Sequence, residues 1–308
     1  MKIIHGINII KRYKGAVIAL GVFDGLHRGH LNILRATVKR AKLIRGTSVV
    51  LTFWPHPQKE ESLYSLKHRL RLFANLGVDV CVVINFNKKF SKISAQDFIK
   101  DVLVKKIGAQ DIYIGKNFRF GRHALGNYNL LSKAAKIYKF NIKKFSIIRI
   151  NKKIVSSTAI RKLIKEGNLA ASEKLLGRRV SVLGSVIKGS SLGRKIGYPT
   201  ANINPHHEVI PPAGIYAVEV ILSKKTHSGI CYIGRRPTIC AKNKSVRIEV
   251  HIFDFCKNIY GKFLEIQFVK LIRADKKFAS LKDLTNQIRK DMLTCRKILL
   301  RHFRNHNS

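Results

Sequence analysis

Hydrophobic and polar residues follow one another along the first half of the chain in blocks that predict strands separated by helices. Apolar runs of the length of a buried strand occupy 15–22, 47–53, 79–85 and 111–115. Between these runs, apolar residues recur at helical spacing over 29–44, 66–76 and 94–107. Strands joined by helices of this length predict a parallel sheet with helices on its faces.

The N-terminal residues predict one further strand. Their apolar run is interrupted by His5 and Gly6, ends in Lys11 and Arg12, and has no small-residue cleavage pattern. We therefore expect a strand here rather than a signal peptide.

The pattern changes after about residue 178, where short alternating runs are separated by Gly and Pro. Five such runs predict strands: 180–189, 214–223, 228–234, 245–255 and 262–272. In "SVRIEVHIF", Val246, Ile248, Val250 and Ile252 share one face, and Arg247, Glu249 and His251 share the other. Several short strands with turn signals predict an antiparallel barrel or sandwich.

A final helix is predicted over about 280–303. Ser280 with Asp283 three residues later forms a variant of the capping box. Near-helical spacing then predicts a face that packs on the second domain, made of Leu281, Leu284, Ile288, Met292 and Cys295. We therefore expect an α/β domain over 1–177 and a β-barrel domain with a C-terminal helix over 178–308, with the boundary near Gly177 and Arg178.

Length and composition are those of a folded protein of two ordinary domains. The chain has 308 residues, of which 45% are hydrophobic and 25% charged, and it contains no run of about 18 apolar residues. We expect no membrane span. The five cysteines are scattered, odd in number and not in C-x-x-C spacing, so neither a disulfide framework nor a zinc site is expected, and a cytoplasmic location fits.

The net charge of +43, from 60 Lys and Arg against 17 Asp and Glu, suggests attraction to polyanions. The lysines are spread over the whole length, and no basic block alternates with aromatic residues. Abundant Lys, Ile and Asn together are also typical of a biased genome. We therefore expect general polyanion attraction without a dedicated nucleic acid partner.

The stretch "ALGVFDGLHRGHLNIL" at 19–34 carries the first candidate site. Gly21, Gly25 and Gly29 surround His27 and His30 where a predicted strand meets a predicted helix. Glycines allow close approach to a phosphate, and a helix N-terminus directs N–H groups at it. Each imidazole can donate a hydrogen bond to a phosphoryl oxygen. Taken alone, the glycine spacing is equally typical of an ordinary turn with two loop histidines.

A second phosphate-binding element is predicted in "VSSTAIRKLIKEG". Ser156, Ser157 and Thr158 lie at a helix start, Arg161 follows one turn later, and Gly167 ends the helix. Hydroxyls, helix N–H groups and a guanidinium together suit the phosphates of ATP. By itself, the element is also compatible with a simple helix cap.

A third element lies in "GSVIKGSSLGRKIGYPTANIN", residues 184–204. The segment from Gly189 to Arg194 is a Gly/Ser loop that can hold phosphates through main-chain N–H groups, although no G-K-[ST] closes it as in a Walker A loop. A hairpin loop with exposed lysines is the alternative.

Taken together, these motifs resemble those of the bifunctional prokaryotic riboflavin kinase/FAD synthetases. "GVFDGLHRGH" resembles the HxGH signature of nucleotidyltransferases, "SSTAIR" the SSTxIR element, and "GYPTAN" the GxPTAN signature of riboflavin kinases. "VVLTFWPHP", "GKNFRFG", "IGRRPT" and "LIRADKKF" follow in the family's order, and the resemblance covers roughly residues 15–291. It implies a Rossmann-like FMN adenylyltransferase domain and a riboflavin kinase barrel.

The resemblance also implies two reactions and the residues that carry them. In the kinase domain, Thr200 and Asn202 bind Mg²⁺ and the ATP phosphates, and Glu249 takes the proton of the riboflavin 5′-hydroxyl. In the other domain, His27 and His30 stabilise charge while an FMN phosphate oxygen attacks the α-phosphate of a second ATP. The implied nucleotide and phosphate contacts are Gly21, Phe23, Asp24, Gly25, Gly29, Asn117, Ser156, Ser157, Thr158, Arg161 and, in the kinase, Gly189.

The chain departs from the family pattern near its ligand sites. Trp54 stands where relatives often carry an acid, Asn117 where many carry Asp, and Tyr232 where Asn is usual. Two alternatives therefore stay open: one of the two activities is lost, or the chain is a basic RNA-binding protein on this scaffold. The HxGH signature also occurs in class I aminoacyl-tRNA synthetases, but no KMSKS-like loop is present. The sequence does not fix the oligomeric state.

Overall fold

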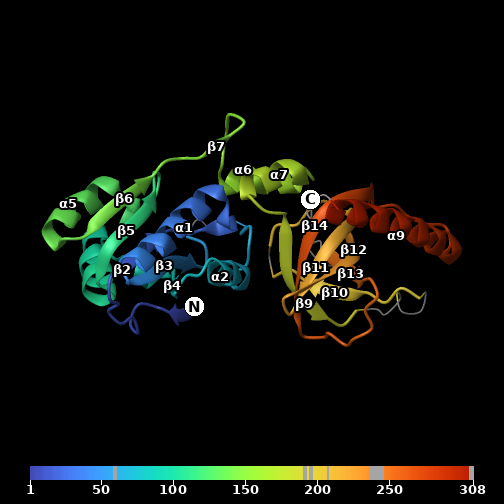
Figure 1. The fold of residues 1–308 in the computed structure, drawn as a ribbon, viewed down its shortest axis with the longest axis horizontal. Coiled ribbons are helices and arrows are strands. Elements are labelled where there is room, and N and C mark those ends of the chain that lie inside the picture. The colour runs from blue at the N-terminus through green and yellow to red at the C-terminus, as the bar shows by residue number, and fades with distance from the viewer. Residues whose placement is uncertain (58–60, 190–192, 194–196, 207, 236–245, 305–308) are drawn as a thin grey trace. The chain divides into compact units, whose positions relative to one another are not determined.

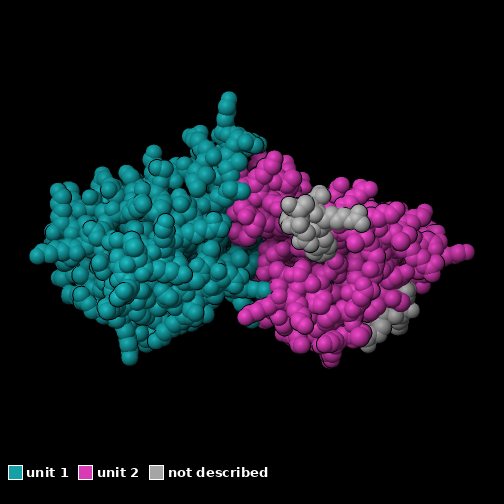
Figure 2. All heavy atoms as spheres, in the orientation of Figure 1, with its two compact units in different colours: residues 1–159 teal, residues 160–308 magenta. Residues whose placement is uncertain are grey.

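A computed structural model describes residues 1–57, 61–189, 193, 197–206, 208–235 and 246–304 of the chain. It divides into two compact units, residues 1–159 and 160–308, which Figure 2 colours separately. This division falls inside one helix, and the functional boundary expected near residue 177 stays a prediction. Each unit is described by itself.

The first unit is a parallel sheet of six strands in the order β1-β4-β3-β2-β5-β6 (Figure 1). All five strand pairs are parallel. The strands are β1 (Lys2–His5), β2 (Ala16–Leu20), β3 (Thr47–Trp54), β4 (Val80–Asn85), β5 (Ala109–Gly115) and β6 (Asn141–Phe145), followed by a small hairpin of β7 (Arg149–Ile150) and β8 (Lys153–Ile154). The N-terminal strand and the four strands predicted from apolar runs are confirmed; β6 was not predicted.

Helices cover both faces of this sheet. They are α1 (Arg28–Leu43), α2 (Leu66–Asn75), α3 (Lys88–Ser91), α4 (Ala95–Asp97) and α5 (Tyr128–Tyr138), with the short turns η1 (Asp24–Leu26) and η3 (Arg122–Ala124) and the π-helical segment η2 (Phe98–Ile107). Along β2, Ile18 and Leu20 join the core under η2 and α5, whereas Val17 and Ala19 join the core under α1 and α2. This alternation explains why β2 is a continuous apolar run: both of its faces are buried.

Two further helices, α6 (Ser157–Lys165) and α7 (Leu169–Leu176), lead into the second unit. There six antiparallel strands close a barrel in the order β10-β13-β12-β11-β14-β9. The strands are β9 (Ser181–Ile187), β10 (Ala201–Asn204), β11 (Gly214–Leu222), β12 (Lys225–Arg235), β13 (Val246–Ile252) and β14 (Phe263–Ala274). The five predicted strands are confirmed, and the barrel rather than the sandwich is the outcome. The sequence reasoning missed β10.

The C-terminal helix α9 (Leu281–Arg304) packs on the outside of the barrel. Cys295 and Leu299 are buried against Ala217 and Phe253. At its start, Ser280 Oγ accepts from the Asp283 N–H at 3.1 Å and donates to the Asp283 carboxylate at 2.7 Å, as the capping pattern predicts. Leu281 differs from expectation: it is 61% exposed, because it lies in the first turn, before the helix meets the barrel cluster.

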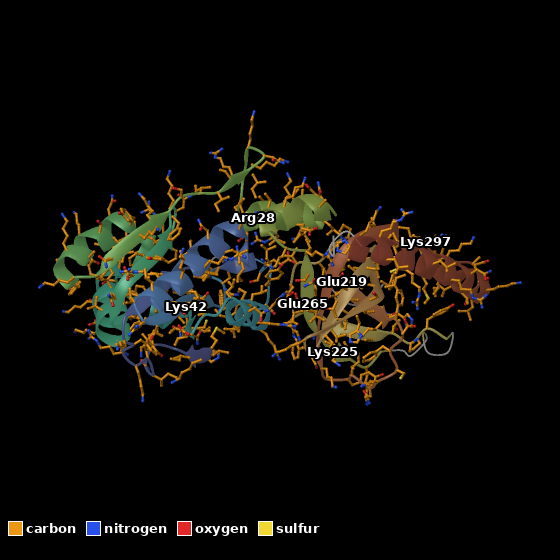
Figure 3. The ribbon with its side chains drawn as sticks, in the orientation of Figure 1. Arg28, Lys42, Glu219, Lys225, Glu265 and Lys297 are labelled. Atoms are coloured by element: carbon orange, nitrogen blue, oxygen red, sulfur yellow. The ribbon has the colours of Figure 1, made fainter. Side chains whose placement is uncertain are left out.

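The cations are distributed over both units. Lys42 on α1, Lys225 on β12 and Lys297 on α9 are all exposed (Figure 3). No helix in the described part of the chain combines the length and apolar character that crossing a bilayer requires. Exposed lysines thus surround the apolar cores of both units.

Candidate active sites

The first candidate site lies at the carboxyl edge of the parallel sheet. The chain leaves β2 for β3 on one side, whereas β5 lies on the other side of β2. Such a switch in strand order opens a crevice at the carboxyl ends of the strands, where ligands bind in open α/β sheets. The loop of the two histidines follows β2, and the exposed Asn117 comes directly after β5. The topology thus brings both sequence-predicted segments to the same crevice.

The two histidines lie together at the start of α1. The His30 N–H donates to Nδ1 of His27 at 3.3 Å, so the His27 ring caps the helix. Their rings are stacked with centroids 3.7 Å apart, and the ring of Phe23 meets that of His30 edge-on. Because Nδ1 of His27 accepts a hydrogen bond, the neutral ring carries its proton on Nε2. Nε2–H is the donor that a phosphoryl oxygen requires.

The loop before the helix has an unusual backbone path. Phe23 has φ of 54° and Leu26 of 41°, and Gly25 has φ of 74°. A Cβ on Gly25 would lie 2.4 Å from the Leu63 side chain, so only glycine fits here. Gly21 is packed against the Phe23 ring, and Gly29 lies against the His27 ring. The three glycines therefore allow the loop to pack closely against Leu63 and around the aromatic rings of Phe23 and His27.

Asp24, predicted to contact the nucleotide, has a buried carboxylate that is bound to the main chain. It is 3% exposed and accepts from the N–H of Leu63 at 2.9 and 3.2 Å and from that of Tyr64 at 3.4 Å. These bonds tie the histidine loop to the segment before α2. They give Asp24 a positional role, and its contact with nucleotide stays a prediction.

The start of α6 is attached to the same loop. Ser157 Oγ donates to the main-chain oxygen of Asp24 at 2.8 Å, and Ser156 Oγ caps the helix by accepting from the Ala159 N–H at 3.2 Å. Residues 133 positions apart are thereby joined. Thr158 is exposed beside them. Arg161 lies one turn along α6, in the second compact unit, so its part in this site stays a prediction.

One buried cation beside the histidine loop was missed by the sequence reasoning. Arg69 on α2 is 1% exposed, and its Nη1 donates to the carbonyl oxygen of Val22 at 2.6 Å. Burial lowers the pKa of this guanidinium, and the negative charge of Asp24 opposes that shift. The sequence offers one indication that Arg69 is buried: it lies four residues before the buried Phe73, on the same apolar face of α2.

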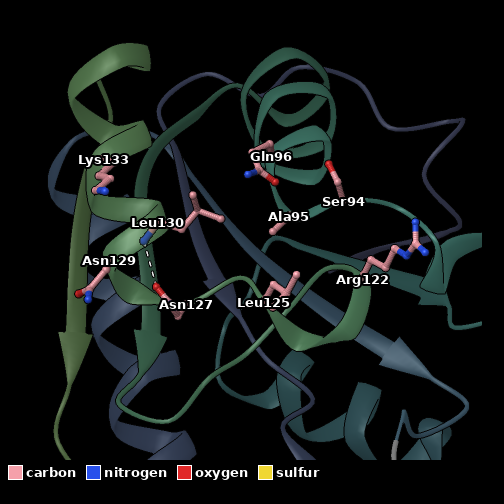
Figure 4. Close-up of a pocket in the computed structure, with 9 residues that line it drawn as sticks. All are labelled: Ser94, Ala95, Gln96, Arg122, Leu125, Asn127, Asn129, Leu130 and Lys133. Carbon is pink, nitrogen blue, oxygen red and sulfur yellow. Dashed lines mark hydrogen bonds between the residues drawn. The ribbon is translucent and has the colours of Figure 1, made fainter.

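A separate pocket of about 360 Å³ opens between the start of α4 and the start of α5 (Figure 4). Polar groups line it, among them Ser94, Arg122, Asn127 and Lys133. Asn127 Oδ1 caps α5 by accepting from Leu130, and Ser94 caps α4. None of the sequence-predicted site residues lines this pocket.

The second candidate site is a row of residues across strands of the barrel. Asn202 on β10 and Tyr232 on β12 both lie directly opposite Glu249 on the intervening β13. Directly opposed residues in antiparallel strands project to the same face. Ile248 and Val250 are buried on the other face, as predicted, whereas Val246 at the strand end is 39% exposed. Glu249 forms an ion pair with Arg247, its neighbour on the same face.

Two glycines of the predicted phosphate loop, Gly189 and Gly193, pack against Asn202 and Thr200 at one end of this row. A Cβ on Gly189 would lie 2.0 Å from Asn202 Nδ2, and one on Gly193 would lie 3.1 Å from Thr200 Oγ1. Only main chain without side chains can approach Thr200 and Asn202 this closely. Nearby, His251 Nδ1 lies 2.8 Å from the carbonyl oxygen of Pro199, which fixes the start of β10. Residues 190–192 and 194 of the predicted loop lie outside the described residues.

Tyr232 lies opposite Glu249 in this row and is held by contacts of its own. Its hydroxyl donates to the Asp275 carboxylate at 3.2 Å, and its ring covers Gly234. Burial raises the pKa of Tyr232, and the nearby charge of Asp275 adds to that shift. The tyrosine therefore forms a fixed wall of the row beside Glu249.

Comparison with known proteins assigns both units to characterised families. Residues 9–159 match the FAD synthetase family, and residues 176–299 match the riboflavin kinase family. The bifunctional riboflavin kinase/FMN adenylyltransferase of Escherichia coli is 36% identical over 306 residues, which cover 96% of this chain and 97% of that protein. The enzyme of the same name from Haemophilus influenzae is 35% identical, covering 96% and 98%. A crystal structure of a macrolide-efflux protein from Streptococcus pneumoniae has a TM-score of 0.83 at 28% identity, covering 96% of this chain and 99% of that one.

Proposed function

The chain belongs to the bifunctional riboflavin kinase/FMN adenylyltransferase family, and from this premise we propose which of its residues carry out the two reactions. The enzyme phosphorylates riboflavin with ATP to FMN and then adenylylates FMN with a second ATP to FAD. The FAD synthetase match lies within the first compact unit and the riboflavin kinase match within the second. The substrates are therefore riboflavin, FMN and ATP.

For the kinase, Glu249 is the general base. It accepts the proton of the riboflavin 5′-hydroxyl as that oxygen attacks the γ-phosphorus and ADP departs. The observation that supports this is the direct pairing of Glu249 with Asn202, because it allows the base and a phosphate-binding amide to act on one face of the barrel. Positioning and charge stabilisation then supply most of the rate enhancement in phosphoryl transfer.

Thr200 and Asn202 would also hold Mg²⁺. A hydroxyl and an amide oxygen are hard ligands that suit this ion, and the main chain of Gly189 and Gly193 packs closely against these two residues. When bound, the ion neutralises phosphate charge. Among the described residues, no group of three or more His, Cys, Asp or Glu side chains is placed to hold a metal ion.

For adenylyl transfer, His27 and His30 stabilise the α-phosphate as the FMN phosphate oxygen attacks it and pyrophosphate leaves. The Nε2 proton of His27 is directed by the capping bond at Nδ1. Ser156, Thr158 and Arg161 would hold the departing pyrophosphate, and Asn117 would contact the nucleotide from the end of β5. The bond from Ser157 to Asp24 carries this proposal, because it joins the two phosphate-binding motifs.

Variants that separate the two reactions test the assignment. His27→Ala should lower FAD formation from FMN by about 100-fold or more, the loss typical of one such donor, and leave FMN formation intact. Glu249→Gln should abolish FMN formation and leave FAD formation from supplied FMN intact. If either variant depresses both rates equally, the assignment of residues to reactions is wrong.

We further propose that the enzyme acts in the cytoplasm and has no dedicated nucleic acid partner. The absence of a dedicated nucleic acid partner is supported by exposed lysines that occur on elements of both units, such as Lys42 on α1, Lys225 on β12 and Lys297 on α9. RNA binding, measured across salt concentrations, should be weak and lost at moderate salt. RNA binding that survives such salt would favour the alternative of an RNA-binding role.

A further inference from the structure

Arg69 places a positive charge inside the carboxyl edge of the parallel sheet. Its Nη1 donates to the carbonyl oxygen of Val22 at 2.6 Å and to Thr52 Oγ1 at 3.4 Å, and its Nη2 donates to the carbonyl oxygen of Phe53 at 3.4 Å. Val22 follows β2, and Thr52 and Phe53 belong to the end of β3. One side chain from α2 therefore bridges the carboxyl ends of two neighbouring strands.

The charge of Arg69 is not matched by a direct ion pair within the described residues. Its acceptors are two carbonyl oxygens and a hydroxyl, and its guanidinium lies over the ring of Trp54, 5.2 Å from the centroid. Nε is buried and has no hydrogen-bond partner there. Burying a charge with neutral partners is unfavourable, so this arrangement persists only if the rest of the fold holds it in place. The ring of Trp54 supplies a π face to this cation.

The bond to Val22 bears on the histidine loop. The Val22 carbonyl also accepts from Thr52 Oγ1 at 2.8 Å, so two donors fix the peptide that leads into Phe23. Phe23 and Leu26 have positive φ, which is unfavourable for these residue types. Strained loops keep their shape only where their surroundings over-determine it. Thr52 and Arg69 provide that constraint at the start of the loop that carries His27.

We propose that Arg69 is a positioning residue for adenylyl transfer: it holds the Val22 peptide so that the histidine loop keeps the geometry the α-phosphate requires. The proposal rests on the assignment of that reaction to this loop. It is independent of the kinase row in the barrel, so kinase activity is an internal control in the same chain. Trp54 is the neutral partner that allows the charge to be buried.

Arg69→Gln in the full chain is the principal test. We expect the kcat for FAD formation from FMN to fall at least about tenfold, because displacement of catalytic groups by about 1 Å lowers rates by up to about 100-fold. The KM for FMN should change little, and FMN formation from riboflavin should be unchanged. Arg69→Lys, which keeps a charged donor, should recover most of the lost kcat. A folded Arg69→Gln enzyme with wild-type kcat would overturn the proposal, as would Arg69→Lys being as slow as Arg69→Gln.

Thr52→Val provides a second test if Arg69→Gln does not fold. It removes the other donor to the same carbonyl with little change in shape, and it should lower the same kcat by a smaller factor. Ser48→Ala is the matched control. Ser48 lies on β3, like Thr52, but near the opposite end of the strand, and its Oγ donates to the Asp79 carboxylate at 2.6 Å. It should lower the melting temperature without affecting kcat. Equal kinetic effects of Thr52→Val and Ser48→Ala would mean that only stability is involved and would overturn the proposal.

The single tryptophan gives a readout that does not depend on activity. Trp54 contacts the guanidinium, so its emission spectrum should change in Arg69→Gln and stay close to wild type in Arg69→Lys and Ser48→Ala. Unchanged emission in Arg69→Gln would show that the cation does not lie over the ring, which removes the basis of the proposal. If the wild-type chain forms no FAD from FMN at all, the proposed function fails before Arg69 is tested.

Discussion

Asp24→Asn tests how the histidine loop is held, because it changes one charge with almost no change in shape. Both carboxylate oxygens accept from the Leu63 N–H, at 2.9 and 3.2 Å. In the variant, an amide oxygen can keep one of these contacts, but the amide nitrogen then faces the same N–H as a second donor.

The magnitude follows from the kind of bond that is lost. Hydrogen bonds to a charged group contribute about 1.5–3 kcal/mol and neutral ones about 0.5–1.5, so the exchange removes about 1–2 kcal/mol. The Tyr64 contact, at 3.4 Å, is long and adds little. For a unit of this size, such a loss lowers the melting temperature by about 2–8 °C.

Two assays on the same variant check this reasoning. Calorimetry should show the lower melting transition, and FAD formation from FMN should fall about tenfold or more because the loop carries His27. FMN formation should stay within about twofold of wild type, since the residues assigned to it belong to the other unit and share no partner with Asp24. A variant with wild-type melting and wild-type FAD formation would refute the structural role of Asp24. A parallel loss of FMN formation would refute the separation of the two sites.

Three other changes probe the rest of the chain. Gly189→Ala should raise the KM for ATP in FMN formation about tenfold, because its methyl group would lie 2.0 Å from Asn202 Nδ2; an unchanged KM in steady-state assays would mean that the close approach has no part in ATP binding. Burial raises the pKa of Cys81 and of Cys295 to about 12, so both thiols stay protonated at pH 8 and should react slowly with an alkylating reagent, whereas the exposed Cys256 should react fast. Peptide mass spectrometry of the native protein measures the three labelling rates. Labelling of Cys81 as fast as that of Cys256 would contradict the packed core. Ser280→Ala should destabilise α9 by about 1 kcal/mol through loss of its cap, and an unchanged denaturation midpoint for the barrel unit would show that the helix start contributes nothing.

The strand and helix pattern of this chain is readable from sequence because most of its elements have one or two buried faces. β2 is apolar throughout, β4 is apolar up to its last residue, Asn85, and β13 alternates with period two, so each is recognisable without a structure. β10 is different: its sequence "ANIN" has one buried residue, Ile203, and its pairing comes from neighbouring strands rather than from its own composition. A search for apolar runs therefore does not detect the strand that carries Asn202.

The candidate sites show the same limit. The histidine loop, the SST helix start and Glu249 have sequence signatures, and the register of β10 and β13 then pairs Asn202 with Glu249. Arg69 has no such signature: its place on the apolar face of α2 is a weak signal, because an arginine on an amphipathic helix ordinarily lies at the surface. Its burial depends on carbonyl oxygens at the ends of two neighbouring strands, which lie 47 and 16 residues before it in the sequence, and only the folded sheet brings them together. The same holds for Asp24, whose partners follow it by about forty residues.

The central claim is that one chain carries both reactions, each in its own unit. The most direct measurement supplies riboflavin and Mg²⁺ with ATP labelled at either the γ- or the α-phosphorus, and follows the label into products. The account predicts that γ-label enters FMN, and that FAD contains the γ-label in its FMN phosphate and the α-label in its AMP half, with release of ADP and pyrophosphate. FMN formation without any α-label in flavin, or FAD formation only from supplied FMN, would show that a single activity is retained and would contradict the account.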